Sequence, residues 1–531
     1  MAKLYDVLII GGGAIGSTIA RELSRYRLAV GVLEKNPDIL CETSGRNSGV
    51  IHAGFNNKSG TLMAKYCVEG CAVFPGVCEE LGVPYKIAGK LVTGFSKGDI
   101  EILEKLKEQG DRNGCPDLRI ISAREIKQIE PYVEGTAALY SPRTGIFSPF
   151  QYTVGMAENA VANGVEYFLC REVTAVSVKG NHYYELKTSS REAFCGRWLI
   201  NSAGLHADKV AALAGVAGYK IYSCRGEYYV LDKAASEYLS IPVYPVPNEK
   251  EGGLGIHLTP TTEGNILIGP SSEYICDPDG ECIDAPGGGY ADGREDYANT
   301  RDTMDMLIRE GSKLMPYLKR EHFIGAFAGV RPKLAGPDMG GYADFAIIET
   351  GNTPGTLDEP HTPGVTHAQG TPFSQCTPHT PRAIHLIGME SPGLTASVPI
   401  ARDIVRMICK WEPLKKNMRF NPIRKPPVRF NTLSDAEKAE LIRVNPNYGE
   451  IVCRCQSITR QEVLDAIHNP LGAQTIVAIK NRTTCMMGRC QGGFCQTRIV
   501  ETLMRETGKP AADVLYGRIG GNMFFGNVRQ Q

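Results

Sequence analysis

A glycine-rich turn near the N-terminus sets the fold class of this chain more firmly than any other segment. Residues 5–10 form a short apolar run, residues 11–16 read GGGAIG, and a helical stretch follows. Gly11, Gly13 and Gly16 match the G-x-G-x-x-G spacing, in which glycines allow a tight turn, close approach of backbone to a pyrophosphate, and close helix–strand packing. The helix N-terminus then offers backbone amides, here those of Ala14 and Ile15, to the phosphates.

The next strand supports the same interpretation. The apolar run at residues 29–33 is followed by Glu34 and Lys35, about 20 residues after the glycines. A carboxylate at this place takes ribose hydroxyls and disfavours a 2′-phosphate, which argues against NADP. A glycine-rich turn alone is a weak signal, but strand, glycines, helix, second strand and terminal acid together predict a dinucleotide site.

The rest of the first 410 residues has the pattern of an α/β protein. Apolar β-like runs alternate with helical stretches. Segments 227–231, 254–259 and 265–269 resemble antiparallel strands, so we expect a β-sheet substrate domain interleaved with a Rossmann-type domain. Segments 276–300 and 350–381 are rich in Gly, Pro, Asp and Thr and are predicted to be surface insertions.

Charge and hydropathy limit the partners and the compartment. The chain has 58 basic and 58 acidic side chains and a formal net charge of zero, which gives no electrostatic reason to expect nucleic acid. No run reaches the roughly 20 apolar residues of a membrane-spanning helix, although peripheral association with a membrane stays open. The N-terminus lacks the features of a signal peptide, so a cytoplasmic location is predicted.

The cysteines divide the 531-residue chain. Twelve of 17 are scattered through the first 409 residues, and the other five fall between Cys453 and Cys495. In a chain without a secretion signal, such a group indicates metal or redox ligation rather than disulfides. We expect an interleaved unit at 1–420, a basic, Pro-rich linker at 421–445 and a small α-rich domain at 446–531.

The spacing of the late cysteines favours an iron–sulfur cluster. Cys453 and Cys455 form C-x-C, and Cys485, Cys490 and Cys495 follow at intervals of five. Four thiolates are what a [2Fe–2S] cluster requires. A structural zinc site is the alternative, although the usual C-x2-C pairs are absent. Spacing alone leaves open whether Cys485 replaces one of the other ligands.

Four further segments carry recognisable motifs: CETSGRNSGVIHAGF (41–55), REVTAV (171–176), INSAGLHAD (200–208) and HLIGMESPGLTAS (385–397). Together they resemble the D-amino-acid-oxidase-type family of FAD-dependent oxidoreductases, which includes glycerol-3-phosphate and L-2-hydroxyglutarate dehydrogenases. The resemblance implies FAD as the cofactor. The residues that it places at FAD are Thr43, Ser44, Arg46, Asn47, Ser48, Val173, Ala203, Gly204, Gly388, Gly393 and Leu394. Some relatives attach FAD through a histidine, so covalent attachment at His52 stays open.

The C-terminal segment resembles bacterioferritin-associated-ferredoxin-like [2Fe–2S] domains. That resemblance implies Cys453, Cys455, Cys490 and Cys495 as the ligands and leaves Cys485 spare. Such a cluster would accept electrons from the flavin and pass them to a partner, an electron-transfer flavoprotein or a reductase subunit.

Oxidation of an alcohol also needs a base and a fixed cation. His257 and His52 lie in family-like motifs and are the candidate bases, with a structural histidine as the alternative for each. Arg331 and Arg225 are the candidate anion ligands, with Lys333 and Tyr228 as secondary candidates.

The substrate is predicted to be a small anionic hydroxy metabolite. Domain architecture favours glycerol 3-phosphate, oxidised to dihydroxyacetone phosphate. L-2-hydroxyglutarate or an amino acid is the alternative, acted on by a dehydrogenase or an O2-using oxidase. A non-catalytic electron-transfer subunit is the third alternative.

Overall fold

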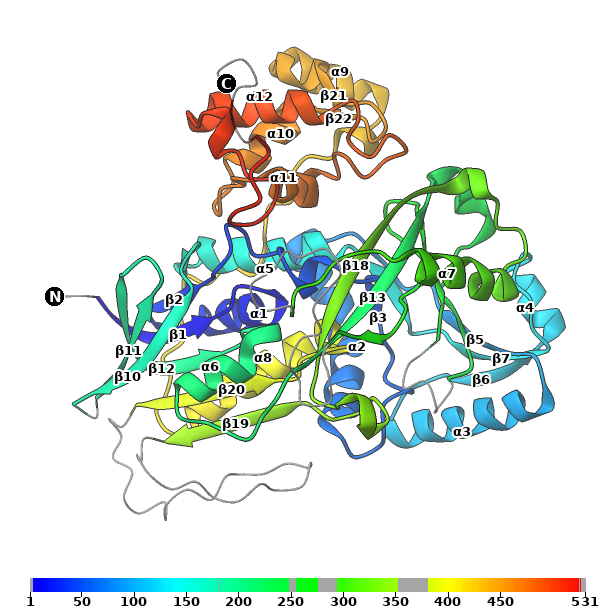
Figure 1. Ribbon diagram of the computed structural model, residues 1–531, viewed down its shortest axis with the longest axis horizontal. Coiled ribbons are helices and arrows are strands. Elements are labelled where there is room, and N and C mark those ends of the chain that lie inside the picture. The colour runs from blue at the N-terminus through cyan, green and yellow to red at the C-terminus, as the bar shows by residue number, and fades with distance from the viewer. Residues whose placement is uncertain are drawn as a thin grey trace.

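The structure is a computed structural model, and it describes residues 3–180, 182–247, 255–275, 294–351, 381–524 and 526. Most of the two predicted insertions, 276–300 and 350–381, lies outside the described residues. Two sheets form the body of the large domain, and a small helical domain lies on it (Figure 1).

The first sheet carries the predicted dinucleotide unit. Its strands are β1 Leu4–Ile10, β2 Val30–Leu33, β9 Glu166–Phe168, β10 Val173–Lys179, β11 Tyr183–Thr188, β12 Ala193–Asn201, β19 Ala346–Gly351 and β20 Arg382–Ile387. The order β20-β12-β1-β2-β9 is parallel, and β10, β11 and β19 add antiparallel strands at one side. The predicted Rossmann-type arrangement is confirmed.

Helices cover this sheet and bury its apolar side chains. They are α1 Ala14–Leu23, α2 Leu62–Leu81, α5 Pro149–Ala162, α6 Ala207–Leu213 and α8 Gly393–Cys409. Ile19 of α1 and Ile400 of α8 pack with Val7, Val32 and Ile384 of the strands, all fully buried. This core fixes the turn after β1 and the turn before α8 relative to each other.

The second sheet is the predicted substrate sheet. Its strands are β5 Lys90–Gly94, β6 Arg119–Ser122, β7 Ala137–Ser141, β13 Tyr222–Leu231, β14 Val243–Pro245, β15 Leu258–Pro260, β16 Ile266–Ile268, β17 Glu273–Tyr274 and β18 Phe323–Lys333. A separate small sheet contains β3 Val50–Ile51, β4 Tyr85–Lys86 and β8 Gly145–Phe147. Helices α3 Lys97–Asn113, α4 Ala123–Ile129 and α7 Arg301–Leu314 belong to this half of the domain. The long pair β13–β18 rises toward the small domain (Figure 1).

The small domain has its own core. It contains α9 Asp435–Val444, β21 Ile451–Cys453, β22 Ile458–Thr459, α10 Arg460–Ile467, α11 Ile476–Thr483 and α12 Gln496–Thr507. Val463, Ile479, Ile499 and Leu503 are fully buried in one cluster. Capping boxes begin α9 at Ser434 and α10 at Thr459, each closed by a glutamate three residues later.

The predicted linker at 421–445 differs from a plain tether. Its second half contains helix α9. Its first half is held on the large domain: the Arg424 amide donates to the Glu80 carbonyl, and the Arg424 guanidinium pairs with Glu158 at 2.6 Å. Because these contacts are buried, we infer that the segment fixes the approach of the small domain.

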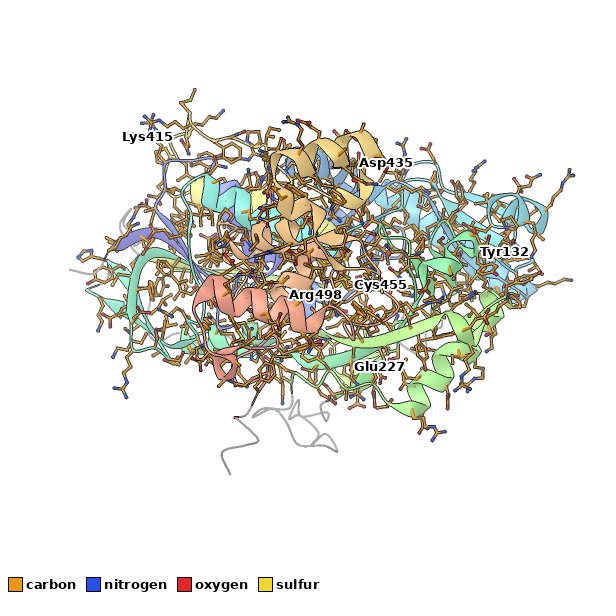
Figure 2. The ribbon with its side chains drawn as sticks, turned by 90° about the horizontal axis from the view of Figure 1, so that it is seen from above. Tyr132, Glu227, Lys415, Asp435, Cys455 and Arg498 are labelled. Carbon is orange, nitrogen blue, oxygen red and sulfur yellow. The ribbon has the colours of Figure 1, made fainter. Side chains whose placement is uncertain are left out.

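The small domain docks through buried polar contacts. Arg482 of α11 forms a two-point ion pair with Asp38, with both nitrogen–oxygen distances 2.8 Å. The Gln151 amide of α5 donates to the Arg482 carbonyl at 2.8 Å. Seen from above, the small domain covers the middle of the large one, with Cys455 and Arg498 over its centre (Figure 2).

Candidate functional site

The turn between β1 and α1 requires its glycines. A Cβ on Gly11 would lie 2.5 Å from the Ser202 carbonyl oxygen, and Gly11 has a φ of +97°. A Cβ on Gly16 would lie 2.0 Å from the Gly11 carbonyl oxygen. Gly13, the N-cap residue of helix α1, makes no side-chain cap, and the Ala14 amide donates to the Ser44 hydroxyl at 2.9 Å. This geometry fits a pyrophosphate.

A cavity of 440 Å³ opens at this turn and runs past the ends of β1, β2, β12 and β20. The predicted residues that line it are Gly11, Gly13, Ala14, Ile15, Glu34, Lys35, Thr43, Ser44, Val173, Ala203 and Gly204. We call it the dinucleotide cavity. Carboxyl ends of parallel strands are where such folds bind nucleotides, so the predicted residues meet in a suitable place.

The remaining predicted residues of this group do not line the cavity. Gly16 lies behind the turn, where it packs against Gly11. The others hold the loop and the turn before α8: Asn47 donates to the Ser44 carbonyl, and Arg46 to that of Ala328. Ser48, Gly388, Gly393 and Leu394 are also absent from the lining. Their roles at FAD stay predictions.

Glu34 is held rigidly at the cavity edge. It accepts hydrogen bonds from the backbone amides of Gly12 and Asn36, each at 2.9 Å. Burial, and the nearby charge of Glu42, raise the pKa of Glu34 to about 7. A carboxyl fixed in this way is positioned to bond ribose hydroxyls.

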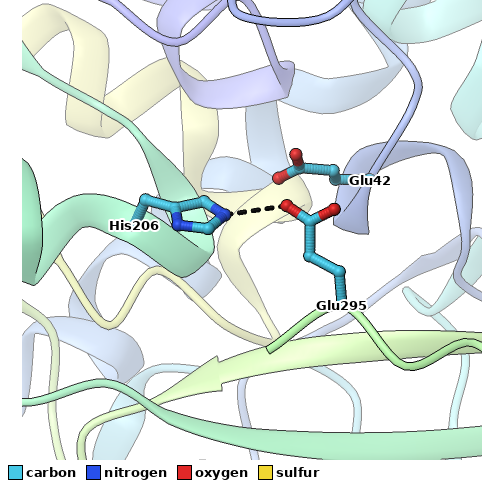
Figure 3. A group of neighbouring side chains, drawn as sticks. All are labelled: Glu42, His206 and Glu295. Carbon is cyan, nitrogen blue, oxygen red and sulfur yellow. Dashed lines mark hydrogen bonds and ion pairs between the residues drawn. The ribbon is translucent and has the colours of Figure 1, made fainter. Parts of the chain in front are cut away.

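A charged cluster closes the outer wall of the dinucleotide cavity. Ligand atoms of Glu42, His206 and Glu295 lie within 4.8 Å of one another (Figure 3). Lys35 pairs with Glu42 at 2.8 Å and also with Glu295. Arg518 of the small domain pairs with Glu295 at 2.5 Å. Lys35 and Arg518 supply the positive charge here, so we do not propose a metal.

A second cavity, of 350 Å³, adjoins the first along β18 and the β20–α8 turn. Pro332 lines the dinucleotide cavity, while its neighbours Arg331 and Lys333 line the second one. Likewise, Met389 lines the dinucleotide cavity and its neighbour Glu390 lines the second one. We call the second space the substrate cavity.

The substrate cavity is rich in positive charge. Its lining contains His52, Lys90, Arg331 and Lys333, with Glu390 as the carboxylate. Lys333 lies 3.4 Å from Glu390, whereas Arg331 donates to the Ser271 carbonyl at 3.0 Å and has no partner for its Nε among the described residues. Glu390 therefore balances only part of the charge, which suits an anionic ligand.

The two candidate histidines differ in position. His52 lines the substrate cavity, and burial together with the charge of Lys90 lowers its pKa to about 3. His257 is outside the lining and stacks on the Tyr244 ring, with ring centres 3.7 Å apart. Burial lowers the pKa of His257 well below its usual range, and its Nε2 meets no partner in the part of the chain that the structure describes. Both imidazoles are neutral, and His52 is the one that a ligand in the cavity would meet.

Two further candidate substrate ligands, Arg225 and Tyr228, have other partners in the fold. Arg225 pairs with Glu273 at 2.7 Å and with Asp296, and it does not line the substrate cavity. Tyr228 stacks on Phe327, with ring centres 4.6 Å apart. Binding of substrate by Arg225 stays a prediction, but its paired carboxylates argue against it.

The late cysteines gather at one end of the small domain. Cys453, Cys485 and Cys495 are buried, whereas Cys455 and Cys490 are exposed. Hydrogen bonds from Cys485 and Cys495 lower the pKa of Cys453, which favours the thiolate that binds iron. Cys490 hydrogen bonds with Cys455. These contacts place Cys453 beside Cys485 and Cys495, and Cys490 beside Cys455. The set of four ligands stays a prediction, with Cys485 as a competitor for one place.

Comparison with known proteins identifies both domains. Residues 6–407 match the FAD dependent oxidoreductase family, and residues 451–505 match the BFD-like [2Fe-2S] binding domain. This chain belongs to the FAD-dependent oxidoreductases. Its cofactors are FAD and a [2Fe–2S] cluster, as the sequence predicts. The residues that line the dinucleotide cavity fit FAD, which supplies a two-electron acceptor when bound.

Similar proteins of this family act on small hydroxy acids or phosphates. A glycerol 3-phosphate dehydrogenase of Caloramator mitchellensis is 33% identical over 99% of this chain and 100% of its own length. The human mitochondrial L-2-hydroxyglutarate dehydrogenase is 31% identical over 62% of this chain and 72% of its own. The FAD-bound L-alpha-glycerophosphate oxidase of Mycoplasma pneumoniae superposes with a TM-score of 0.67 at 29% identity, covering 80% of this chain and 100% of its own.

Sequence reasoning missed several residues of the two cavities. Glu42 and His206 lie inside quoted motifs, so their presence in the outer wall could have been inferred. Lys90 begins strand β5 and carries no motif that would mark it. Arg518 contacts the wall from a distant part of the chain, and only the folded arrangement reveals it.

Proposed function

We propose that this FAD-dependent oxidoreductase is a dehydrogenase that oxidises glycerol 3-phosphate to dihydroxyacetone phosphate. The observation that supports it most is the relative named glycerol 3-phosphate dehydrogenase, which aligns over both domains. The substrate cavity agrees with this proposal, because its cations suit a phosphate and because it directly adjoins the dinucleotide cavity.

The side chains of the substrate cavity then have separate tasks. Arg331 and Lys333 bind the phosphate group, with Arg331 offering a fixed fork of donors. His52 is neutral and accepts the proton of the substrate hydroxyl. FAD, when bound, would take a hydride from the carbon that bears this hydroxyl, so the alcohol would lose two electrons and two protons in all and become a ketone.

The docked small domain offers a route out for the electrons. Helix α11 contacts α5, and α5 in turn contacts residues 43–45. These belong to segment 41–55, which the family resemblance places at FAD and which we call the FAD loop. The positive charge of Arg46 in that loop contributes to a lowered pKa of Lys480 in α11, after burial. Cys485 follows α11 directly, so the cluster-binding segment lies beside the FAD loop. We infer that the cluster receives the electrons here and passes them to a partner electron-transfer flavoprotein or reductase.

A second substrate has specific support. Several relatives at 31–35% identity are L-2-hydroxyglutarate dehydrogenases, although they align with 50–67% of this chain. A dicarboxylate would also satisfy the cations of the substrate cavity. Glycerol 3-phosphate is preferred because the Caloramator relative also spans the cluster domain.

The test is reduction of the bound flavin without oxygen. The holoenzyme is mixed with glycerol 3-phosphate, L-2-hydroxyglutarate or an amino acid, and flavin absorbance is followed. Glycerol 3-phosphate should bleach the flavin fastest, and Arg331→Ala should slow bleaching about 100-fold or more at subsaturating substrate. The exposed Arg143, paired with Asp117, gives the control Arg143→Ala. Bleaching by L-2-hydroxyglutarate alone would replace the proposal with its alternative.

The remaining proposal concerns the location of the protein in the cell. Among the described residues, no helix is both long and apolar enough to span a bilayer. We propose that the enzyme works in the cytoplasm. Fractionation of cells that express the full chain should recover flavin and iron together in the cytosolic fraction.

A further inference from the structure

One lysine of the substrate cavity has no task in the proposed reaction. Lys90 begins β5, between β14 and β7 in the substrate sheet. Its side chain is about as buried as a lysine can be, with 1% of its surface exposed. It still lines the substrate cavity together with His52 and Arg331.

Aromatic rings hold the Lys90 ammonium in place. Its nitrogen lies 3.3 Å from the centre of the Tyr244 ring and 5.2 Å from that of Phe55. His257 stacks on Tyr244 at 3.7 Å, so the lysine and the histidine must occupy opposite faces of that ring. These ring contacts fix the Lys90 nitrogen at the cavity wall. It can therefore contact only a ligand that lies inside the substrate cavity.

The ammonium lacks a counter-ion in the described part of the chain. No described carboxylate pairs with it, although Lys333 and Arg225 elsewhere in the domain have such partners. Its charged and titratable neighbours are His52 and His257, on which it acts unfavourably, and the thiol of Cys67 on α2. A buried charge without a partner is costly, so either the group loses its proton or a ligand anion balances it.

We infer that Lys90 is a ligand for the anionic group of the substrate, facing the same cavity as Arg331. This inference rests on the proposed function only in taking the substrate to be an anion that binds in this cavity. A phosphate or a carboxylate at Lys90 supplies the missing negative charge. The flat ring of Tyr244 beneath the ammonium then sets where the anion lies.

A consequence follows for His52. Burial lowers the pKa of Lys90 to about 7, so binding of an anion should return the ammonium form and take up a proton at pH 8. The bound anion also offsets the charge of Lys90, which is one cause of the low pKa of His52. The anion and the ammonium balance each other beside His52, so the imidazole stays neutral and able to accept a proton.

The experiment measures anion binding rather than turnover. Inorganic phosphate and glutarate are titrated separately into holoenzyme, with perturbation of the flavin spectrum as readout, in wild type, Lys90→Met, Lys90→Arg and the surface control Lys107→Met. Lys90→Met should weaken the preferred anion about 100-fold, whereas Lys90→Arg should remain within about tenfold of wild type. Calorimetry at pH 8 in two buffers of different ionisation enthalpy should show proton uptake in wild type.

Each outcome has a stated meaning. Unchanged anion affinity in Lys90→Met, with a slower flavin bleaching that Lys90→Arg does not restore, would overturn the inference and indicate a proton acceptor. Absence of proton uptake by wild type would overturn it even if Lys90→Met failed to fold. The proposed substrate is tested separately, by which compound bleaches the wild-type flavin, so it can fail while the anion site at Lys90 stands.

Discussion

The buried ion pair between the two domains allows a quantitative test. Arg482 and Asp38 are 5% and 3% exposed and meet through two contacts of 2.8 Å. Replacing Asp38 by Asn keeps the shape but leaves the guanidinium buried without its charge partner. Removal of one partner of such a pair costs about 3–5 kcal/mol. Because the cost falls on the docked arrangement, the docking equilibrium should weaken by about 100-fold or more.

Two measurements follow the loss of docking. Protease should cut Asp38→Asn faster within the segment between the domains, and substrate should reduce an external acceptor more slowly. Flavin bleaching by substrate should stay within about twofold of wild type, because the substrate cavity is untouched; flavin content normalises each preparation. The double variant Asp38→Leu/Arg482→Met should recover much of the docking, since an apolar pair avoids the unpaired charge.

A matched exposed pair provides the control. Arg143 and Asp117 are more than half exposed and meet at 2.9 Å. Asp117→Asn should change stability by less than about 1 kcal/mol and leave both measurements unaltered. If Asp38→Asn behaved like this control, the ion pair would not hold the domains together, and the reasoning about docking would be refuted.

Three further results are expected. Gly16→Ala should abolish retention of FAD, measured as flavin per protein, whereas Gly98→Ala, which meets nothing closer than 3.8 Å, should retain it; flavin in both would contradict the turn geometry. Lys90 has a folded pKa of about 7, below its usual 10.5, so the unfolded chain binds more protons between these values and stability should rise with pH there. Lys90→Met should be more stable than wild type near pH 7, by at most about 5 kcal/mol, with the gap in melting temperature narrowing toward pH 10; a constant gap would contradict the burial argument. Cys490→Ser should lose iron and sulfide while Cys485→Ser keeps them, and the reverse would exchange their assignments.

Local signals made much of the fold predictable. The glycine turn, the acid after β2 and the capping boxes at Ser434 and Thr459 each depend on neighbours in the chain, so sequence reveals them. The spacing of the late cysteines indicates an iron–sulfur cluster, so it too can be read from the sequence. The turn and the acidic edge of the dinucleotide site, Glu34 included, could therefore be predicted from the motifs, although several predicted residues lie outside the cavity lining.

The substrate site was less predictable because it depends on long-range packing. Its lining joins β5, β18 and the turn before α8, and the first and last of these lie about 300 residues apart in the chain. Lys90 resembles any strand residue until Tyr244 and His257 are seen beside it. Arg225 illustrates the opposite error: its motif suggests a ligand, but Glu273 and Asp296 neutralise it within the fold.

The position of Arg518 means that the small domain cannot be exchanged independently of the large one. It belongs to the cluster-bearing domain, yet it pairs with Glu295 in the outer wall of the FAD cavity and donates to the Cys41 carbonyl at 2.9 Å. A ferredoxin-like module grafted from another protein would bring its irons but not this guanidinium. Such a hybrid would lose the ion pair to Glu295 and the hydrogen bond to Cys41, so the grafted segment must carry its own replacement for Arg518.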